Sequence, residues 1–436
     1  MKRRKFLKAT SAAGLGLVGS PRFPSWLRSP SEQVRVAVMG MNGRGTVLAR
    51  GFARAAHAEV AYVCDVDSLV LAKGGVAVAG AQRKSPKAVG DFRRALEDKD
   101  VDALVIAAPD HWHTPAALLA LQAGKHVYVE KPCGHNPREG ELLVEAQRKH
   151  RRVVQMGTQQ RSAPRSIEIV QAIREGAIGR PYLARTWYAN TRGPIGRGKT
   201  APVPANLDYE LWQGPAPRTP YRDNVIHYNW HWFRRWGTGE ILNNGTHEID
   251  VARWALGVTY PTRVTSFGGR YHYADDWEFP DTQEAWFEFA DGTTIIWQGQ
   301  SCNGLTTFGR GRGTAILGTA GSLVLDRDGY TMYDLKEKVI KASLAAQAGD
   351  GLNISGDDEM TALHIDNFVD AIRTGAALRQ PIEEGAKSVL LGHLGNIAQS
   401  TGRALRIDAT SGRITGDEEA MKLWQREYAP GWAPAV

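Results

Sequence analysis

The fold is decided by the stretch Val34-Arg35-Val36-Ala37-Val38-Met39-Gly40-Met41-Asn42-Gly43-Arg44-Gly45. Its apolar first half predicts a short strand, and residues 46–54 after the glycines predict a helix. A second strand is expected over residues 59–64, and Asp65 ends it about twenty residues beyond the glycine turn. A glycine turn between a strand and a helix lets backbone N–H groups approach a pyrophosphate, whose charge the positive end of the helix dipole favours.

These features predict a dinucleotide site. Its turn residues are Gly40, Asn42, Gly43, Arg44 and Gly45. The Asp65 carboxylate can accept hydrogen bonds from both ribose hydroxyls and would repel a 2′-phosphate, which favours NAD over NADP. Asn42 stands where the G-x-G-x-x-G pattern has its middle glycine. The alternatives are an ordinary strand-to-helix turn and another adenosine ligand, such as S-adenosylmethionine.

Residues 1–31 are expected to be an export signal and linker. Arg3 and Arg4 stand just before Phe6-Leu7-Lys8, and the weakly apolar run 9–19 that follows is too short to span a bilayer. This pattern resembles a twin-arginine signal, which implies the twin-arginine translocation machinery as a partner and a periplasmic or otherwise exported protein. The alternative is a disordered basic tail.

The leader also accounts for most of the net charge. The chain has 54 Lys and Arg against 46 Asp and Glu, a formal net charge of +8. Residues 1–30 hold seven basic and no acidic side chains, so removing them leaves +1. A near-neutral remainder gives no electrostatic reason to expect a nucleic-acid partner. Three cysteines, an odd and sparse set, form no disulfide framework.

The remaining length, roughly 400 residues, exceeds what one hydrophobic core usually holds, so two domains are expected. Residues 32–160 are predicted to form an NAD(P)-binding Rossmann domain, and residues 161–436 a substrate-binding and oligomerisation domain. The first domain continues the alternation of strand and helix, which predicts a doubly wound parallel sheet. Its further strands are expected over 101–108, 126–129 and 153–156, and its further helices over 114–121 and 137–150.

Past residue 161 strand-like alternation dominates, and Asp291-Gly292 and Ala320-Gly321 are hairpin signals. The predicted fold is therefore α/β plus α+β, with a large, mostly antiparallel sheet in the C-terminal domain. Helices at 362–374 and 382–401, or a second subunit in a homo-oligomer, would cover one face of that sheet. The strands are expected over 180–190, 263–270, 282–289, 293–298, 314–318 and 322–325.

Candidate catalytic residues follow the strands of the first domain. Glu130-Lys131-Pro132 comes directly after strand 126–129, the fourth in the predicted sheet, so its side chains should emerge at the carboxyl edge where open α/β sheets bind ligands. A lysine desolvated there could take a hydroxyl proton or hold the oxygen. The alternative is a surface lysine paired with Glu130. Cofactor contacts at this edge are expected from Pro109, His113, Glu130 and Lys131.

A second cluster lies in a helix expected to end at Gly257. Asn243 and His247 are four residues apart, and His247 and Asp250 three, so the three share one helix face. A histidine on that face suits proton relay. A zinc site is not predicted, because Val251 stands where H-E-x-x-H requires its second histidine.

Together these features resemble the Gfo/Idh/MocA family of nicotinamide oxidoreductases over essentially the whole mature chain. Glu130-Lys131-Pro132 resembles the active-site lysine motif of the family, and residues 243–250 resemble its D-x-G-x-H-x-x-D segment. The resemblance implies that Lys131 and His247 are catalytic and that Asp250 supports substrate binding. The leading aspartate of that segment is Asn243 here, and an amide cannot accept a proton, although it can hold a substrate hydroxyl.

A sugar substrate is predicted from the aromatic run 227–236, because aromatic rings stack on apolar sugar faces while imidazole and guanidinium groups bind hydroxyls. The alternative is a buried loop or a subunit contact. The candidate sugar contacts are His227, Trp230, His231, Asn243, Asp250 and Arg161.

The sequence thus predicts an exported oxidoreductase that moves a hydride between NAD(P) and a sugar. Outside the cytoplasm no nicotinamide pool recycles a released cofactor, so NAD, with NADP less favoured, is expected not to dissociate. Two alternatives remain. One is a redox-neutral, NAD-dependent glycosidase or lyase that acts through a transient keto-sugar, and the other is a sugar-binding or sensory protein with a vestigial redox site.

Overall fold

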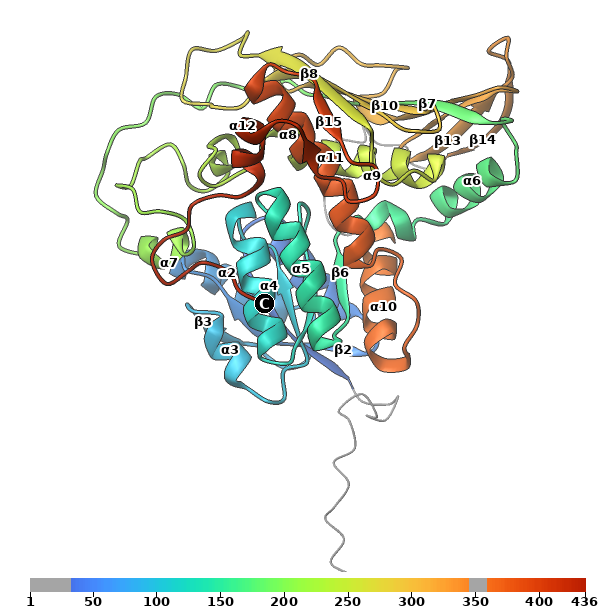
Figure 1. The fold of residues 1–436 in the computed structure, drawn as a ribbon. Helices are drawn as coiled ribbons and strands as arrows, with labels where there is room; N and C mark the ends of the chain where they lie inside the picture. Colours follow the sequence, from blue (N-terminus) through green and yellow to red (C-terminus); the bar gives the residue numbers. More distant parts are fainter. Residues whose placement is uncertain (1–32, 345–358) are drawn as a thin grey trace, which may run out of the picture.

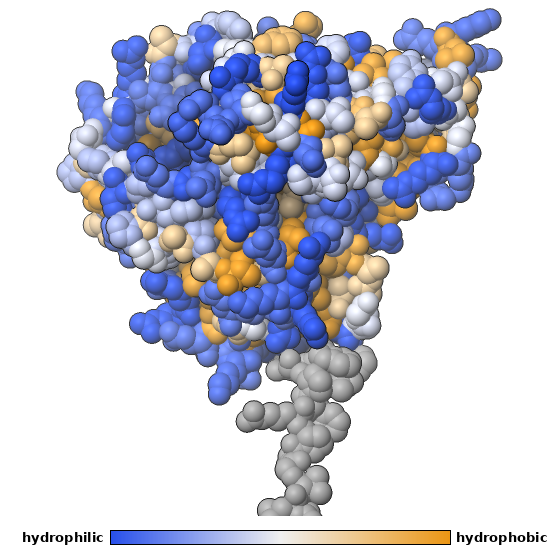
Figure 2. Space-filling view, in the orientation of Figure 1, coloured by the Kyte–Doolittle hydropathy of each residue, from blue (hydrophilic) through white to orange (hydrophobic). Residues whose placement is uncertain are grey.

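The computed structural model describes residues 33–344 and 359–436, which form two sheets, one above the other in Figure 1, with helices between and around them. The predicted twin-arginine segment, residues 1–31, lies outside the described residues. No helix within the described ranges is long and apolar enough to cross a membrane. The face seen in Figure 2 is mostly hydrophilic, with apolar residues scattered over it.

The first sheet confirms the predicted doubly wound parallel architecture. All of its strand pairs are parallel, in the order β3-β2-β1-β4-β5-β6. The strands are β1 (Val34–Met39), β2 (Ala58–Cys64), β3 (Lys87–Val89), β4 (Ala103–Ile106), β5 (His126–Val129) and β6 (Val154–Met156). Because the strand order reverses between β1 and β4, a crevice opens at their carboxyl ends.

One strand of this sheet was not predicted. β3 is a short edge strand of three residues, two of them exposed, so it carries no apolar run that a sequence pattern could reveal. Its presence makes β5, which precedes Lys131, the fifth strand along the chain rather than the predicted fourth. The position of Lys131 at the carboxyl edge does not change.

Helices cover both faces of the first sheet. They are α1 (Arg44–Arg54), α2 (Ser68–Ala79), α3 (Arg93–Glu97), α4 (His113–Gln122) and α5 (Pro137–His150). The turn into α1 needs glycine twice. Gly40 has a φ of 85°, and a Cβ added there would meet the backbone of Ala107 and Ala108 at 2.7 to 2.8 Å. A Cβ at Gly45 would collide with the carbonyl oxygen of Gly40.

The second sheet has ten strands in the order β14-β13-β12-β11-β7-β10-β9-β8-β15-β16. Only the β7–β10 pair is parallel, so the predicted mostly antiparallel sheet is confirmed. The six predicted strands are β7 (Pro181–Ala189), β8 (Arg263–Gly269), β9 (Thr282–Glu288), β10 (Thr294–Gln300), β11 (Arg312–Gly318) and β12 (Ser322–Leu325). The strands that the sequence pattern missed lie at the two edges, namely β13 (Gly329–Tyr333), β14 (Val339–Leu344), β15 (Leu405–Ile407) and β16 (Ile414–Thr415).

Three helices cover the inner face of the second sheet. They are α8 (Glu240–Asn243), α9 (Gly245–Leu256) and α11 (Ile382–Thr401), and Figure 1 shows them between the two sheets. The other helices of this half are α6 (Pro164–Arg174), α7 (Tyr209–Gln213), α10 (Glu359–Thr374) and α12 (Glu418–Met421).

The predicted role of α10 as cover for the second sheet is wrong. This helix returns to the first sheet, where Ile365, Phe368 and Val369 join the core that contains Val36 and Tyr128. An amphipathic pattern shows which residues a helix buries but not against which sheet it buries them.

Candidate active site

A cavity of about 430 Å³ lies at the carboxyl ends of the first sheet, facing α8 and α9 of the second half. One wall comes from the glycine turn and the ends of β2, β4 and β5. The other comes from three later segments, which contribute Tyr188, Asn190, Arg192, His227, Tyr228, Trp230, His231, Asn243, Asn244 and His247. The cavity therefore occupies the crevice that the strand order creates, and both halves of the chain contribute to it.

The glycine turn forms one end of this cavity. Gly40, Asn42, Gly43 and Arg44 line it, while Gly45 packs beneath against Gly40. A Cβ added at Gly43 would meet no atom within 4 Å, and no side chain caps the first N–H groups of α1. Open space beside uncapped N–H groups at a helix start fits a pyrophosphate.

Asp65 stands at the rim of the same end. Its Oδ2 accepts a hydrogen bond from the Met41 N–H at 2.6 Å, and its Oδ1 accepts one from the Asp67 N–H at 2.9 Å. Burial raises the pKa of Asp65, and these two donors offset only part of that effect. The two N–H groups fix the orientation of the carboxylate at the rim.

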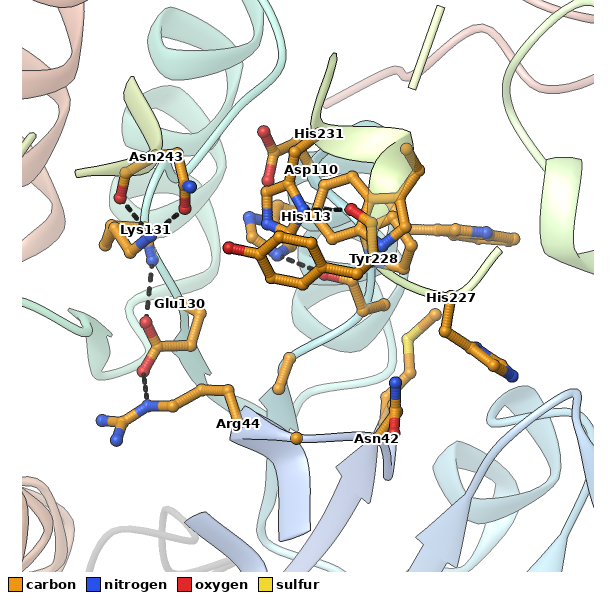
Figure 3. A pocket seen from close by; sticks show the side chains of 18 of the residues that line it. Asn42, Arg44, Asp110, His113, Glu130, Lys131, His227, Tyr228, His231 and Asn243 are labelled. Carbon is orange, nitrogen blue, oxygen red and sulfur yellow. Dashed lines mark hydrogen bonds and ion pairs between the residues drawn. The ribbon is translucent and has the colours of Figure 1, made fainter. Parts of the chain in front are cut away.

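Glu130 is committed to an ion pair. Its Oε1 lies 2.8 Å from Arg44 Nε and accepts a hydrogen bond from Gln159 Nε2 at 3.0 Å (Figure 3). Burial alone would raise the pKa of Glu130, but the charges of Arg44 and Lys131 outweigh it and lower that pKa. Glu130 therefore remains ionised and fixes the start of α1 to the end of β5.

Lys131 crosses the cavity to the second half. Its Nζ donates to the backbone oxygen of Asn243 at 2.5 Å and lies 3.3 Å from the side-chain Oδ1 of the same residue (Figure 3). Burial lowers the pKa of Lys131, and the charges of Glu130 and Asp110 oppose that shift. A desolvated amine at this position can exchange a proton with a ligand.

His247 lines the same cavity, with 5% of the residue exposed. The pKa of His247 is held well below its ordinary value, mainly by burial and to a smaller extent by the charges of Arg327 and Lys131. The ring is therefore neutral at pH 7. The predicted single helix is two, because α8 ends at Asn243 and α9 begins at Gly245. Asn243 and His247 still meet at the cavity across this break.

Sequence reasoning missed Glu240 and Arg192. Glu240 is 4% exposed and accepts hydrogen bonds from Arg192 Nε at 3.0 Å and from Asn244 Nδ2 at 2.5 Å. The Arg192 guanidinium lies 5.1 Å from the Trp232 ring centre and 5.6 Å from that of Tyr228. Arg192 comes from a loop without a recognisable pattern, so only the fold could show that it reaches the cavity.

The aromatic run divides between two places. Tyr228, Trp230 and His231 line the cavity, and the Trp230 and His231 rings stack with centres 3.6 Å apart. Burial lowers the pKa of His231 to about 3. His227 also lines the cavity, but at the Asp65 end, where its Nε2 lies 2.9 Å from Asp67 Oδ2. In Figure 3 it stands near Asn42 and away from Lys131.

Pro109 and His113 also lie on the cavity wall. The ring nitrogens of His113 contact two backbone oxygens, Nδ1 that of Pro132 at 2.5 Å and Nε2 that of Ala108 at 2.7 Å. The ring thus joins the end of β4 to the segment that follows β5, and its polar atoms are occupied by the backbone.

Arg161 and Asp250, predicted as substrate contacts, are not among the residues that line this cavity. They form a buried two-point ion pair, with Nε to Oδ2 and a terminal nitrogen to Oδ1 both at 2.8 Å. Asp250 Oδ1 also accepts hydrogen bonds from Ser388 at 2.6 Å and Gln380 at 2.9 Å. The pair joins the segment after β6 to α9 and α11, which supports a structural role for both residues, while the substrate contact stays a prediction.

We expect the Asp250→Asn variant to lose about 3 kcal/mol of unfolding free energy at pH 7, because the Arg161 charge stays buried without its partner. Burial raises the pKa of Asp250, but Arg161 and its hydrogen bonds outweigh this and lower it. The wild-type advantage is therefore complete above the unfolded pKa of 3.8 and is lost as the pH falls through the lower native value. Urea unfolding at several pH values measures both effects.

Arg403→Ala is the matched control, since it breaks an ion pair with Asp417 whose arginine side chain is 49% exposed. It should change the urea midpoint far less. An Asp250→Asn protein with unchanged stability and weakened sugar binding would contradict the structural role and restore the substrate contact.

Two family models match the chain. The model described as an oxidoreductase family with an NAD-binding Rossmann fold matches residues 13–158. The model described as the C-terminal alpha/beta domain of an oxidoreductase family matches residues 186–325. Together they cover more than half of the chain, and both bear the name Gfo/Idh/MocA.

Two curated relatives resemble parts of the chain. A glycosyl hydrolase family 109 protein of Stenotrophomonas maltophilia is 35% identical over 140 residues, which are 31% of this chain and 30% of that protein. Inositol 2-dehydrogenase of Rubrobacter xylanophilus is 32% identical over 166 residues, which are 38% of this chain and 46% of that protein. The chain thus matches less than half the length of either relative.

Among solved structures, the aldose-aldose oxidoreductase of Caulobacter crescentus complexed with glycerol is similar at a TM-score of 0.65. The match covers 86% of this chain and all of that one at 19% sequence identity. At this identity the likeness shows the shared fold alone.

Proposed function

Because this chain belongs to the Gfo/Idh/MocA family of oxidoreductases, we propose that it transfers a hydride between NAD and a carbohydrate. The observation that carries the proposal is the meeting of Lys131, His247 and the glycine turn at one cavity. When bound, NAD supplies the acceptor or donor of the hydride. Lys131 would take the hydroxyl proton or hold the oxygen, and the neutral His247 ring can accept or relay a proton.

The residues around Asp65, at one end of the cavity, favour NAD over NADP as the cofactor. The Asp65 carboxylate is held by two N–H groups at the rim, where it can accept hydrogen bonds from ribose hydroxyls. A 2′-phosphate there would face the charge of Asp65 and that of Asp67 beside it. The His227 ring contacts Asp67, so the second half of the chain also closes this end.

The residues at the other end of the cavity support the proposal of a carbohydrate substrate. Tyr228, Trp230 and His231 offer ring faces beside the donors of Lys131, Arg192 and Asn243. Aromatic rings can stack on the apolar faces of a sugar, and polar groups that converge on one place can bind its hydroxyls. The names of the relatives agree, since one is an inositol dehydrogenase and one solved structure is an aldose-aldose oxidoreductase.

A panel of aldoses, inositols and nitrophenyl glycosides tests the proposal. We expect at least one member to change the absorbance of the protein-bound cofactor at the NADH band. Lys131→Ala should lower kcat by about 10²- to 10⁴-fold, because it removes the group that exchanges the hydroxyl proton. Lys84→Ala, at an exposed lysine paired with Glu59, is the control and should behave as wild type. Equal kcat for Lys131→Ala and wild type would contradict the proposal.

A redox-neutral glycosidase or lyase is the second candidate, and the similarity to a glycosyl hydrolase family 109 protein favours it. Oxidising a sugar hydroxyl makes the neighbouring C–H acidic, so a glycosidic bond can leave by elimination before the hydride returns. The same panel separates the two candidates. Release of nitrophenol without net change in the cofactor supports the glycosidase, whereas lasting NADH formation supports the oxidoreductase.

A cofactor that does not dissociate is also proposed, and a strap over the Asp65 end supports it. We call residues 206–208 and 227 the strap. Leu207 pairs with Asp67 in an antiparallel bridge, and Ser68 N–H donates to the Asn206 oxygen at 2.9 Å. Asp208 N–H donates to the Val66 oxygen at 2.9 Å, and His227 contacts Asp67. The strap thus ties the second half of the chain to the loop after β2.

Denaturing the purified protein should release NAD at close to one molecule per chain. His227→Ala removes one tie of the strap, and we expect dissociation of NAD about tenfold faster, which corresponds to the loss of one charge-assisted hydrogen bond. Ultrafiltration followed by chromatography of the filtrate measures this rate. His57→Ala, at an exposed histidine before β2, is the control. Equal release from wild type and His227→Ala would refute the role of the strap.

Export through the twin-arginine pathway is proposed on the leader sequence, with Arg3 and Arg4 before Phe6-Leu7. A retained cofactor agrees with that route, since the pathway moves folded proteins and the cofactor could be bound before transport. Recovery of the protein only from the cytosolic fraction of its cells would contradict the proposal.

A homo-oligomer through the second sheet is proposed on the outer face of that sheet. Val264 and Phe287 are fully buried toward the helices, whereas Phe267 and Trp286 on the opposite face are 59% and 40% exposed. Large apolar side chains on an uncovered sheet face favour a contact with a second copy. A monomeric mass in sedimentation equilibrium at micromolar concentration would contradict it.

A further inference from the structure

Three side chains that can bind a metal ion meet at one end of the second sheet, outside the residues that line the cavity. They are His272, Asp281 and Cys302, and each offers one ligand atom. These three atoms all lie within 4.8 Å of one another. His272 is exposed, Asp281 is buried and Cys302 is partly buried, so an ion can reach the group from the solvent.

The register of three neighbouring strands brings these residues together. The first residue of β9 pairs with the last residue of β8 on one side and with the last residue of β10 on the other. His272 follows β8, Asp281 directly precedes β9, and Cys302 follows β10. All three therefore lie at the same end of the sheet. Their wide spacing along the chain matches no metal-binding motif, so the sequence alone does not indicate the group.

Hydrogen bonds hold the Asp281 carboxylate in one orientation. Its Oδ2 accepts from the N–H groups of Tyr271 at 2.9 Å and His272 at 3.2 Å. Its Oδ1 accepts from the Thr282 hydroxyl at 3.0 Å and lies 3.7 Å from His272 Nδ1. Carboxylates that bind metals are commonly held by hydrogen bonds in this way. Oδ1 is therefore the oxygen presented to the imidazole.

The distances are close to those of a zinc site. Zinc lies about 2.0 Å from nitrogen and oxygen ligands and about 2.3 Å from sulfur, so tetrahedral ligand atoms are about 3.3 to 3.6 Å apart. His272 Nδ1 and Asp281 Oδ1 are 3.7 Å apart, and Cys302 Sγ would approach by at most about 1.2 Å. A thiolate, an imidazole and a carboxylate, with a fourth position open to solvent, suit zinc.

The charges around the group also favour a divalent cation. The side chains of Asp275 and Asp281 are 4% and 0% exposed, and both face Arg270. One terminal nitrogen of Arg270 lies 2.5 Å from Asp275 Oδ1, and the other lies 3.3 Å from Asp281 Oδ2. Two carboxylates and one guanidinium leave one negative charge. A Zn²⁺ ion bound by a thiolate adds one positive charge, so the group with its ion is neutral, which lowers the cost of burying it.

Zinc has to displace a proton from Cys302. Burial raises the pKa of this thiol to about 11, and the charge of Asp281 acts in the same direction, so the thiol is protonated at pH 7. As the zinc–sulfur bond forms, the S–H bond breaks and the proton passes to the solvent.

We propose that His272, Asp281 and Cys302 bind one Zn²⁺ ion, which fixes the loop behind the aromatic run 227–236. His272 and Asp281 stand near the two ends of the loop that joins β8 to β9. Within this loop the Trp277 ring stacks on Trp232 with centres 3.9 Å apart, and the Glu278 N–H donates to the Trp232 oxygen at 3.0 Å. The inference goes beyond the proposed function and does not rest on it.

Zinc binding by the purified protein tests the inference. The protein is stripped with EDTA and dialysed against Zn²⁺, and its zinc is counted by mass spectrometry. We expect close to one zinc ion per chain. Cys302→Ser and His272→Gln each remove one ligand and should weaken zinc binding about 100-fold or more. His57→Gln, at an exposed histidine before β2, is the matched control and should bind zinc as wild type does.

Cobalt reports whether the thiolate is a ligand. Co²⁺ replaces zinc in tetrahedral sites, and a bound thiolate gives it a charge-transfer absorption band. Wild type and His57→Gln should show this band, and Cys302→Ser should lack it. Saturating zinc should raise the thermal midpoint of wild type and leave that of Cys302→Ser unchanged, because an ion that binds only the folded chain stabilises it.

A wild-type protein that binds neither zinc nor cobalt would overturn the inference, as would equal zinc binding by wild type and both variants. Uptake of copper without zinc would overturn the choice of metal. If Cys302→Ser does not fold, His272→Gln decides, since His272 is exposed. None of these measurements depends on sugar turnover, so a failure here leaves the proposed function intact.

Discussion

The hydrogen bonds from Lys131 Nζ to Asn243 are the contact on which the candidate site depends. Lys131 follows β5 of the first sheet, and Asn243 ends α8 beneath the second, so this contact joins the two halves across the cavity. Asn243 is buried and Lys131 is partly buried, and this burial lowers the pKa of the lysine. The same contact therefore joins the two halves of the chain and holds the lysine where its pKa is lowered, as the proposed function requires.

Burying so much charge around one cavity requires compensation. Arg44 pairs with Glu130, Arg192 with Glu240, Arg312 with Glu248, and Arg161 with Asp250, and all four carboxylates are buried. Each pair joins segments distant in sequence and satisfies charges that would otherwise be costly to bury. Lys131 and His247 also line the cavity and lie outside these pairs. The ion pairs thus form the scaffold, and the proposed function assigns proton exchange to the two residues that they leave unmatched.

The spacing of apolar residues in the sequence predicted the long helices and the strands with a regular pattern. It failed for strands that are short or whose pattern is ambiguous. β1, α5 and α11 were expected within two residues of their observed bounds, because apolar period and end signals agree there. β3 and β14 escaped prediction because most of their side chains are exposed, and β15 and β16 because they are only three and two residues long. For α10 the helix itself was predicted, but the sheet it covers was not. Which sheet a helix packs against depends on the path of the whole chain.

The sequence by itself determined the glycine turn, the acid after β2, the lysine after β5 and the histidine of α9, because each role follows from a few neighbouring residues. Only the tertiary structure decided which of the other candidates reach the cavity. His227 lies at the Asp65 end of the cavity, and Arg161 and Asp250 form a buried ion pair. Arg192 and Asp110 line the cavity, and Glu240 pairs with Arg192 behind it. These outcomes depend on contacts between residues tens to hundreds of positions apart. Whether a charged residue is buried, and which residue it pairs with, depends on such distant contacts. The spacing of neighbouring residues in the sequence does not encode either.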